Sequence, residues 1–217
     1  MVILNRRWRL DLLMAAGLIA CMSYSLIGET LHEWIGTAVL VLFLWHLVVR
    51  RRWFAGLRRG RWSSSRIFGT ALDGLLCFFT LGLVVSSVML SKYVFAFLPL
   101  NVPDGVGATP HQVCAYWGFL VCALHLGQHG HALATMLKQR LALRASLSRS
   151  LMILVCVGGA LAFLWQNLSA HLLLQTRDFA PMGQLPTFLL AYLFIFMFVA
   201  LIGHVLTQWL QHERRHP

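Results

Sequence analysis

The chain has 217 residues, of which 59% are hydrophobic and only 12% are charged. So few charges cannot cover the surface of a soluble domain of this length, which excludes an ordinary soluble globular protein. The formal net charge of +11 would suit a nucleic-acid-binding protein, but its distribution along the chain is that of a membrane protein, and no nucleic-acid partner is expected.

Six long stretches contain no Asp, Glu, Lys or Arg. About 20 apolar helical residues cross the hydrocarbon core of a bilayer, and each stretch approaches or exceeds that length. We therefore expect an all-α integral membrane bundle of six transmembrane helices in a lipid bilayer, without a separate soluble domain. The stretches are Leu12–Gly28, Trp34–Val49, Gly74–Ser91, Val106–Leu137, Ser150–Thr176 and Pro181–His212.

The first two helices are expected at about Leu10–Ile27 and Leu31–Val49. The link between them, Gly28-Glu-Thr30, is so short that they should form an antiparallel hairpin. The first span also resembles a signal peptide. Its removal would leave five spans and strand the C-terminal arginines on the wrong side of the membrane, so we expect a retained helix.

The rest of the chain alternates between loops and spans. The basic and aromatic loop Arg50–Arg66 is expected at the headgroup surface, and a third helix at Ile67–Leu90. The loop Tyr93–Pro110 follows, and a fourth helix opens at His111, directly after a proline that a first helical turn tolerates. The last two helices are joined through Gln175–Pro186. We divide the chain into a four-helix core, residues 1–135, and two further helices with the C-terminus, residues 136–217.

The basic residues indicate the orientation. With the N-terminus inside, 16 basic residues lie on the inner side and two, Lys92 and Arg177, on the outer side. This asymmetry predicts a multi-pass protein of the bacterial inner membrane with both termini in the cytoplasm. The five cysteines lie within spans without paired spacing, and no C-x-x-C-H motif for covalent haem attachment occurs.

Four histidines form the most informative pattern. Fourteen positions separate His32 from His46 in the second helix, and fourteen separate His111 from His125 in the fourth. That spacing returns a side chain to within about 40° of its starting direction, about 21 Å further along the axis. Each helix should therefore present two imidazoles on one face, near opposite sides of the membrane.

The topology predicts the partners. The second and fourth helices run in the same direction, so His32 should pair with His111 near the outer surface and His46 with His125 near the inner one. Two imidazoles per pair suit axial ligation of haem iron better than tetrahedral zinc, which needs four ligands. The sequence thus predicts two b-type haems in a core of the first four helices. His129, one turn beyond His125, is the alternative inner ligand.

Other residues carry weaker expectations. Small residues such as Gly36, Ala115 and Gly118 could let a flat macrocycle approach the helices, or could serve helix packing. Lys92 and Tyr93 are outer candidates for contacting haem propionates, and Arg51 and Arg52 are inner candidates. Asp11 and Asp73 are expected to pair with the arginine-rich surface, a proton or quinone role being the alternative.

Several motifs resemble the DUF4405, or flavinylation-associated cytochrome, family over about residues 10–135. The resemblance implies a membrane cytochrome that works with an extracytoplasmic flavin-bearing electron-transfer protein. It places the family's histidine pattern on His32, His46, His111 and His125, with His129 also matching, and Arg50 stands where an asparagine is expected. The motifs are Leu31-His-Glu-Trp-Ile-Gly36, Leu44-Trp-His46, Arg51-Arg-Trp-Phe54, Met89-Leu-Ser-Lys-Tyr-Val-Phe95, Ala115-Tyr-Trp-Gly-Phe119 and His125-Leu-Gly-Gln-His129.

The expected function is transmembrane electron transfer through two haems, from a quinone or a cytoplasmic donor to an extracytoplasmic flavoprotein acceptor, as an electron-transfer subunit of an oxidoreductase system. Two alternatives come from other classes. A proton-relay transporter would line one continuous path with histidines, and a passive membrane anchor subunit would need no haem.

Overall fold

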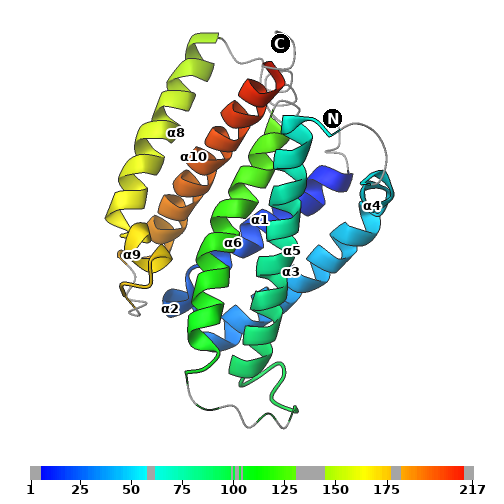
Figure 1. Ribbon diagram of the computed structural model, residues 1–217. Coiled ribbons are helices and arrows are strands. Elements are labelled where there is room, and N and C mark those ends of the chain that lie inside the picture. Colours follow the sequence, from blue (N-terminus) through cyan, green and yellow to red (C-terminus); the bar gives the residue numbers. More distant parts are fainter. Residues whose placement is uncertain are drawn as a thin grey trace.

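The computed structural model describes residues 6–57, 62–98, 100, 103, 105–130, 145–176 and 182–212, and this part of the chain is mainly α-helical (Figure 1). The described residues contain no strand. The helices are α1 (Arg6–Cys21), α2 (Tyr24–Ile27), α3 (Glu29–Val49), α4 (Arg52–Gly56), α5 (Ser64–Leu90), α6 (Ala108–Gln128), α8 (Ala145–Trp165), α9 (Leu168–Leu172) and α10 (Leu185–His212).

In the described part of the chain, four helices are long and apolar enough to cross a membrane: Glu29–Val49, Ser64–Leu90, Leu147–Trp165 and Leu185–His212. Their outward faces carry large exposed apolar side chains, among them Val41, Phe78, Leu164 and Val205. Such a surface would be insoluble in water and suits contact with lipid. The structure therefore supports a helical membrane protein, in agreement with the predicted fold class at this coarser level.

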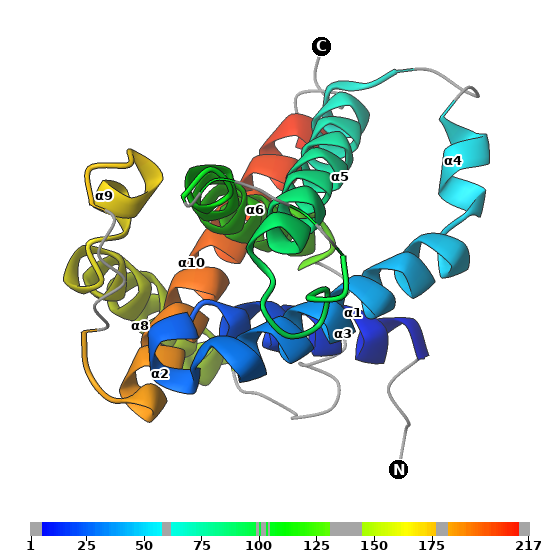
Figure 2. The same ribbon diagram turned by 90° about the horizontal axis from the view of Figure 1, so that it is seen from below.

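The helix α6 does not belong to that apolar set, and its position explains why. It lies between α5 and α10 in the middle of the bundle (Figures 1 and 2). Residues along its whole length are buried, from Gln112 to Gly127. A helix enclosed by protein need not be as apolar as one that faces lipid, so α6 can carry polar side chains.

The first predicted helix, Leu10–Ile27, is interrupted. α1 ends at Cys21, where the Ser23 hydroxyl donates a hydrogen bond of 2.6 Å to the carbonyl of Ala20, and the chain resumes as the single turn α2. Serine side chains that bond to nearby carbonyls compete with helix continuation in this way. Gly28, with φ +82°, then reverses the chain into α3, a conformation that glycine adopts without steric cost.

The other helix boundaries also differ from the predictions by a few residues. α5 begins at Ser64 because the side chain of Ser63 accepts the Arg66 backbone N–H, which caps the helix. α6 begins at Ala108, so His111 lies in its first turn. The span predicted within Ser150–Thr176 breaks at Asn167, which has φ +48°; asparagine is one of the few residues that tolerate this left-handed conformation.

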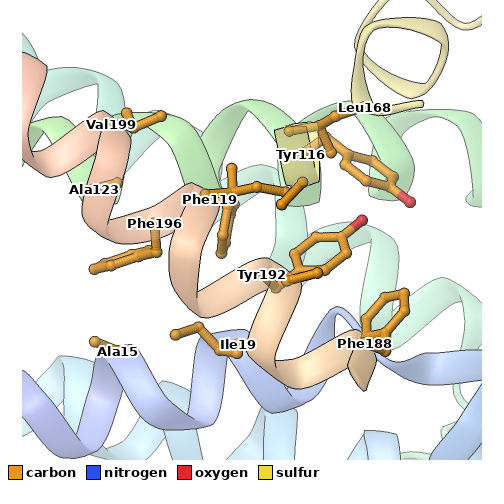
Figure 3. Packing of buried hydrophobic residues seen from close by; sticks show 13 residues of the cluster. Ala15, Ile19, Tyr116, Phe119, Ala123, Leu168, Phe188, Tyr192, Phe196 and Val199 are labelled. Carbon is orange, nitrogen blue, oxygen red and sulfur yellow. The ribbon is translucent and has the colours of Figure 1, made fainter. Parts of the chain in front are cut away.

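The main hydrophobic core joins α6 and α10 and includes part of α1 (Figure 3). Phe119 of α6 makes edge-on contacts with Tyr192 and Phe196 of α10, at centroid distances of 5.6 and 5.4 Å. The two backbones touch further along, because a Cβ placed on Gly203 would lie 2.5 Å from the carbonyl oxygen of Leu124. α10 thus packs tightly along α6. The boundary proposed between residues 135 and 136 lies outside the described residues.

The hairpin of α1 and α3 is inclined to the other long helices (Figures 1 and 2). Within the described part of the chain, α3 packs closely against α1 and the short α2, but not against α5 or α6. A side-chain layer that would normally fill the space between α3 and the α5–α6 pair is therefore incomplete. This leaves room for a cavity beside α3.

Candidate cofactor-binding cavity

A cavity of about 1300 Å³ lies between the α1–α3 hairpin and the α5–α6 pair. Its volume exceeds the range of about 300–1,000 Å³ that is usual for a pocket holding one small molecule. We call its His32 and His111 region the outer end and its His46 and His125 region the inner end, following the predicted topology. All four predicted ligands, and His129, line this single cavity.

At the outer end the structure brings His32 and His111 together. Their ring centroids are 6.0 Å apart and the ring planes are inclined by 65°. Two metal–nitrogen bonds of about 2 Å each, with the ring radius added on both sides, separate two imidazoles across a metal by about 6 Å. The distance alone would also fit a direct edge-to-face contact. The cavity beside the two rings leaves room for a ligand.

Polar neighbours orient both outer rings. Nδ1 of His111 lies 3.1 Å from the Ser86 hydroxyl, which itself donates to the Gly82 carbonyl at 2.7 Å. Since its hydrogen is used there, Ser86 accepts from Nδ1–H, and Nε2 of His111 is left with a free lone pair. His32 has the carbonyl of Cys21 beside it. That carbonyl is free to interact because Cys21 ends α1.

At the inner end, each histidine contacts a carboxylate from the preceding long helix. Nδ1 of His46 lies 3.0 Å from Oδ1 of Asp11 on α1, and Nδ1 of His125 lies 2.8 Å from Oδ1 of Asp73 on α5. A carboxylate beside Nδ1 favours the tautomer with its proton on that nitrogen, which leaves Nε2 able to bind a metal. Among the described residues, no ring contact like that of the outer pair joins His46 to His125; they share the cavity.

The other histidines differ in their surroundings. His129 lines the cavity with its ring centroid 5.3 Å from that of His125, so it stays the alternative inner ligand. His171 stacks on Tyr116 at 4.7 Å, and His204 lies 3.1 Å from the Gln208 amide nitrogen. Neither lines the cavity. His131 and His216 lie outside the described residues.

Small and basic side chains complete the lining. A Cβ placed on Gly36 would meet nothing within 4 Å, so the cavity opens beside this residue, and Ala115 and Gly118 also line it. The basic residues in the lining are Arg50, Arg52 and Arg66 towards the inner end and Lys92 at the outer end. Two of the four predicted propionate contacts, Arg51 and Tyr93, are absent from the lining residues that the structure describes.

Arg50, which departs from the family pattern, has a defined place. Its Nη2 atom lies 2.9 Å from Oδ2 of Asp11, so this carboxylate joins an arginine and His46. Arg50 is four residues after His46 and therefore lies on the same face of the helix. The predicted pairing of Asp11 with the arginine-rich surface is confirmed, whereas the ion pair that the structure gives Asp73 is with His125.

Glu33 closes the outer end of the cavity. Its carboxylate accepts hydrogen bonds from the Ser91 hydroxyl at 2.6 Å and from the backbone N–H groups of Lys92, Tyr93 and Val94 at 2.8, 3.2 and 2.9 Å. Hydrogen bonds to an ionised acceptor are stronger than neutral ones. Glu33 thus ties the start of the outer loop to α3, one residue after His32.

Replacing Glu33 by alanine is expected to lower the melting temperature of the protein in detergent. Four donors would lose their acceptor, which costs about 2 kcal/mol. For a chain of this size that corresponds to a decrease of about 4–8 °C. Differential scanning fluorimetry would measure it.

The matched control is Glu29→Ala, which removes the same charge one turn earlier on α3. Glu29 pairs with Lys92 at 2.9 Å, and the side chain of Lys92 is 69% exposed. This hydrogen bond raises the pKa of the Lys92 amine, but exposed ion pairs contribute little to stability. Equal melting temperatures for the two variants would show that Glu33 does not anchor the loop.

Comparison with known proteins gives no independent identification. No family model, no curated protein and no solved structure matches the chain. The resemblance to flavinylation-associated cytochromes therefore rests on the sequence motifs alone. The described residues also contain no cluster of three or more His, Cys, Asp or Glu side chains that could hold a metal ion.

Sequence reasoning missed the histidine partners Asp11, Asp73 and Ser86. The signal for the two aspartates was present, because each is the one carboxylate within an otherwise uncharged part of its helix. Charged groups within a span usually face a partner or a cavity. Their contact with histidines depends on how α1 packs on α3 and α5 on α6, which the spacing along one helix does not contain.

Proposed function

We propose that the cavity holds two b-type haems, one between His32 and His111 and one between His46 and His125, and that the protein carries electrons across the membrane. The observation that carries this proposal is the meeting of all four histidines at one cavity, with the outer rings 6.0 Å apart. Haem iron supplies reversible one-electron transfer when its two axial positions are filled by imidazole.

The residues present fit such a group. His111, His46 and His125 each have a polar neighbour at Nδ1 (Ser86, Asp11 and Asp73), which leaves Nε2 for a metal, and His32 has the Cys21 carbonyl beside its ring. The absence of a side chain at Gly36 keeps space open between the outer histidines and the middle of the cavity. Arg52 and Lys92 are placed to contact acidic groups of a ligand at the two ends.

The proposed topology has six spans, with both termini on the cytoplasmic side of a bacterial inner membrane. Besides the four apolar helices, α1 and the enclosed α6 would complete the six. The 16-to-2 distribution of basic residues supports this orientation. The inner end of the cavity would then face a quinone or a cytoplasmic donor.

The partner at the outer end would be an extracytoplasmic flavin-bearing protein, as the family resemblance implies. The loop after α5 presents an exposed apolar surface suited to such a contact. Its exposed apolar residues in the described part are Tyr93, Phe97, Leu98, Leu100 and Val106.

One observation also favours a second candidate. A continuous cavity that contains His46, His125 and two aspartates is what a proton-relay transporter would present. The two functions differ in a simple property, since the transporter would be colourless. A dithionite-reduced minus oxidised spectrum and a pyridine haemochrome assay should find two haems b per chain. An iron-free, correctly folded preparation would exclude the cytochrome and leave the transporter or a passive membrane anchor subunit.

A leucine at position 36 should reduce the haem count without unfolding the protein. Its side chain would meet open space in the cavity and so would not clash with the fold, but it would occupy the volume next to the outer pair. We expect Gly36→Leu to keep one haem. Gly74→Leu is the matched control, since Gly74 also has nothing within 4 Å but is exposed and does not line the cavity. The Gly74→Leu variant should keep both haems. Loss of haem in Gly74→Leu but not in Gly36→Leu would contradict the placement of the outer haem beside Gly36.

A further inference from the structure

The two ends of the cavity differ in the charge of the groups that contact the histidines. At the outer end, the neighbours of His111 and His32 are a serine hydroxyl and a backbone carbonyl, both neutral. At the inner end, both neighbours are carboxylates, at 2.8 and 3.0 Å from Nδ1. At both ends, each histidine therefore has a polar group from an earlier helix beside its ring. This group is neutral at the outer end and negatively charged at the inner end.

This difference affects the iron that each pair would bind. A carboxylate beside Nδ1 makes the imidazole a more basic ligand, whereas a hydroxyl or a carbonyl does so less. A more basic ligand and a nearby negative charge both favour ferric over ferrous iron, which lowers the reduction potential. In a low-dielectric cavity these contacts act more strongly than they would in water.

Most other charges at the two ends have partners of their own, and Arg52 is a further charge in the lining of the inner end. At the inner end, Arg50 is bound to Asp11, and Arg66 donates to the carbonyls of Gly56 and Leu57. At the outer end, the Glu33 carboxylate is held by four donors and Glu29 by Lys92. The charged side chains that the structure places in direct contact with the rings of the four histidines are the two aspartates.

We propose that Asp11 and Asp73 are positioning residues that give the inner haem the lower reduction potential, so that electrons run from the inner end to the outer end. This inference rests on the proposed haem binding and gives the inner-to-outer direction of transfer a cause in two residues. The two aspartates should not contribute equally. Asp11 divides its oxygens between His46 and Arg50, so part of its charge is neutralised, whereas the Oδ1 atom of Asp73 contacts His125. Asp73 should therefore have the larger effect.

Spectroscopic redox titration of the purified protein tests the proposal. We expect two components, and His111→Ala should remove the one of higher potential, because it removes the outer haem. Asp73→Asn should increase the ratio of reduced to oxidised inner haem tenfold at a given potential. For a one-electron couple this corresponds to a rise of about 59 mV in the lower reduction potential. Asp11→Asn should raise it by less, and Ser86→Ala should change only the higher potential.

Glu29→Gln is the matched control, because it removes an equal charge at the opposite end of the cavity without touching a ligand histidine. It should leave the lower potential unchanged. Survival of the higher-potential component in His111→Ala, or an unchanged lower potential in Asp73→Asn, would overturn the proposal while leaving haem binding intact. A protein without haem would instead refute the proposed function itself, so the two failures are distinguishable.

Discussion

Alanine at His32 and alanine at His111 should each remove the same single haem, and the double variant should still retain one. The reason is the 6.0 Å distance between the two rings at the outer end, which suits the proposed ligation of one iron by both. His46→Ala and His125→Ala should behave in the same way at the inner end. A double variant with one substitution at each end of the cavity, such as His32→Ala with His125→Ala, should bind no haem. A pyridine haemochrome count on each purified variant gives the numbers.

His171→Ala is the control for this series. His171 stacks on Tyr116 and does not line the cavity, so this variant should keep two haems. One remaining haem in the His32→Ala, His125→Ala combination would mean that these two residues share an iron, and the pairing would be wrong. If His125→Ala kept both haems and His129→Ala lost one, His129 would be the inner ligand.

Electron transfer across vesicles should stop when either haem is lost. The two histidines on α3 are 14 residues apart, which corresponds to about 21 Å along the helix axis. A protein with one haem leaves most of that distance without a carrier. Vesicles with an internal reductant and an external acceptor that cannot cross the bilayer should therefore show transfer with the unmodified protein but not with His46→Ala or His111→Ala.

Gly74→Leu again provides a control, since it alters an exposed position outside the cavity. Its vesicles should transfer electrons at the unmodified rate. If vesicles with His46→Ala transferred electrons as fast as those with the unmodified protein, the proposed transmembrane route would be wrong. Such a result would not bear on haem binding. A loss of transfer in Gly74→Leu would indicate that reconstitution, and not the missing haem, limits the measurement.

The sequence predicted the helices best where one property of the chain decides them. α3 differs from its predicted start by only two residues, because the uncharged apolar run Trp34–Val49 makes up most of it and Gly28 and Arg50 bound it. The 14-residue spacing predicted that each of the two helices presents both of its histidines on one face, because position along a helix fixes both face and depth, and the structure places all four at one cavity. These inferences need only the geometry of one helix.

The features that were missed depend on side chains of neighbouring segments. The break after Cys21 arises from the Ser23 hydroxyl bonding to a carbonyl three residues back, which hydropathy does not detect. The lower apolar content of α6 reflects its enclosure by α5 and α10, and enclosure is a property of the assembled bundle. Likewise, the contacts of Asp11 and Asp73 with histidines follow from the packing of one helix on the next.

The separate packing of the α1–α3 hairpin has a consequence for biosynthesis. His32 precedes His111 by 79 residues and His46 precedes His125 by the same number, so the two halves of each pair leave the ribosome at different times. At about 5–20 residues per second, the delay is about 4–16 s. During that interval the hairpin is complete but lacks the helix that supplies the second ligand. Each proposed haem would therefore gain its second ligand only after α6 has emerged.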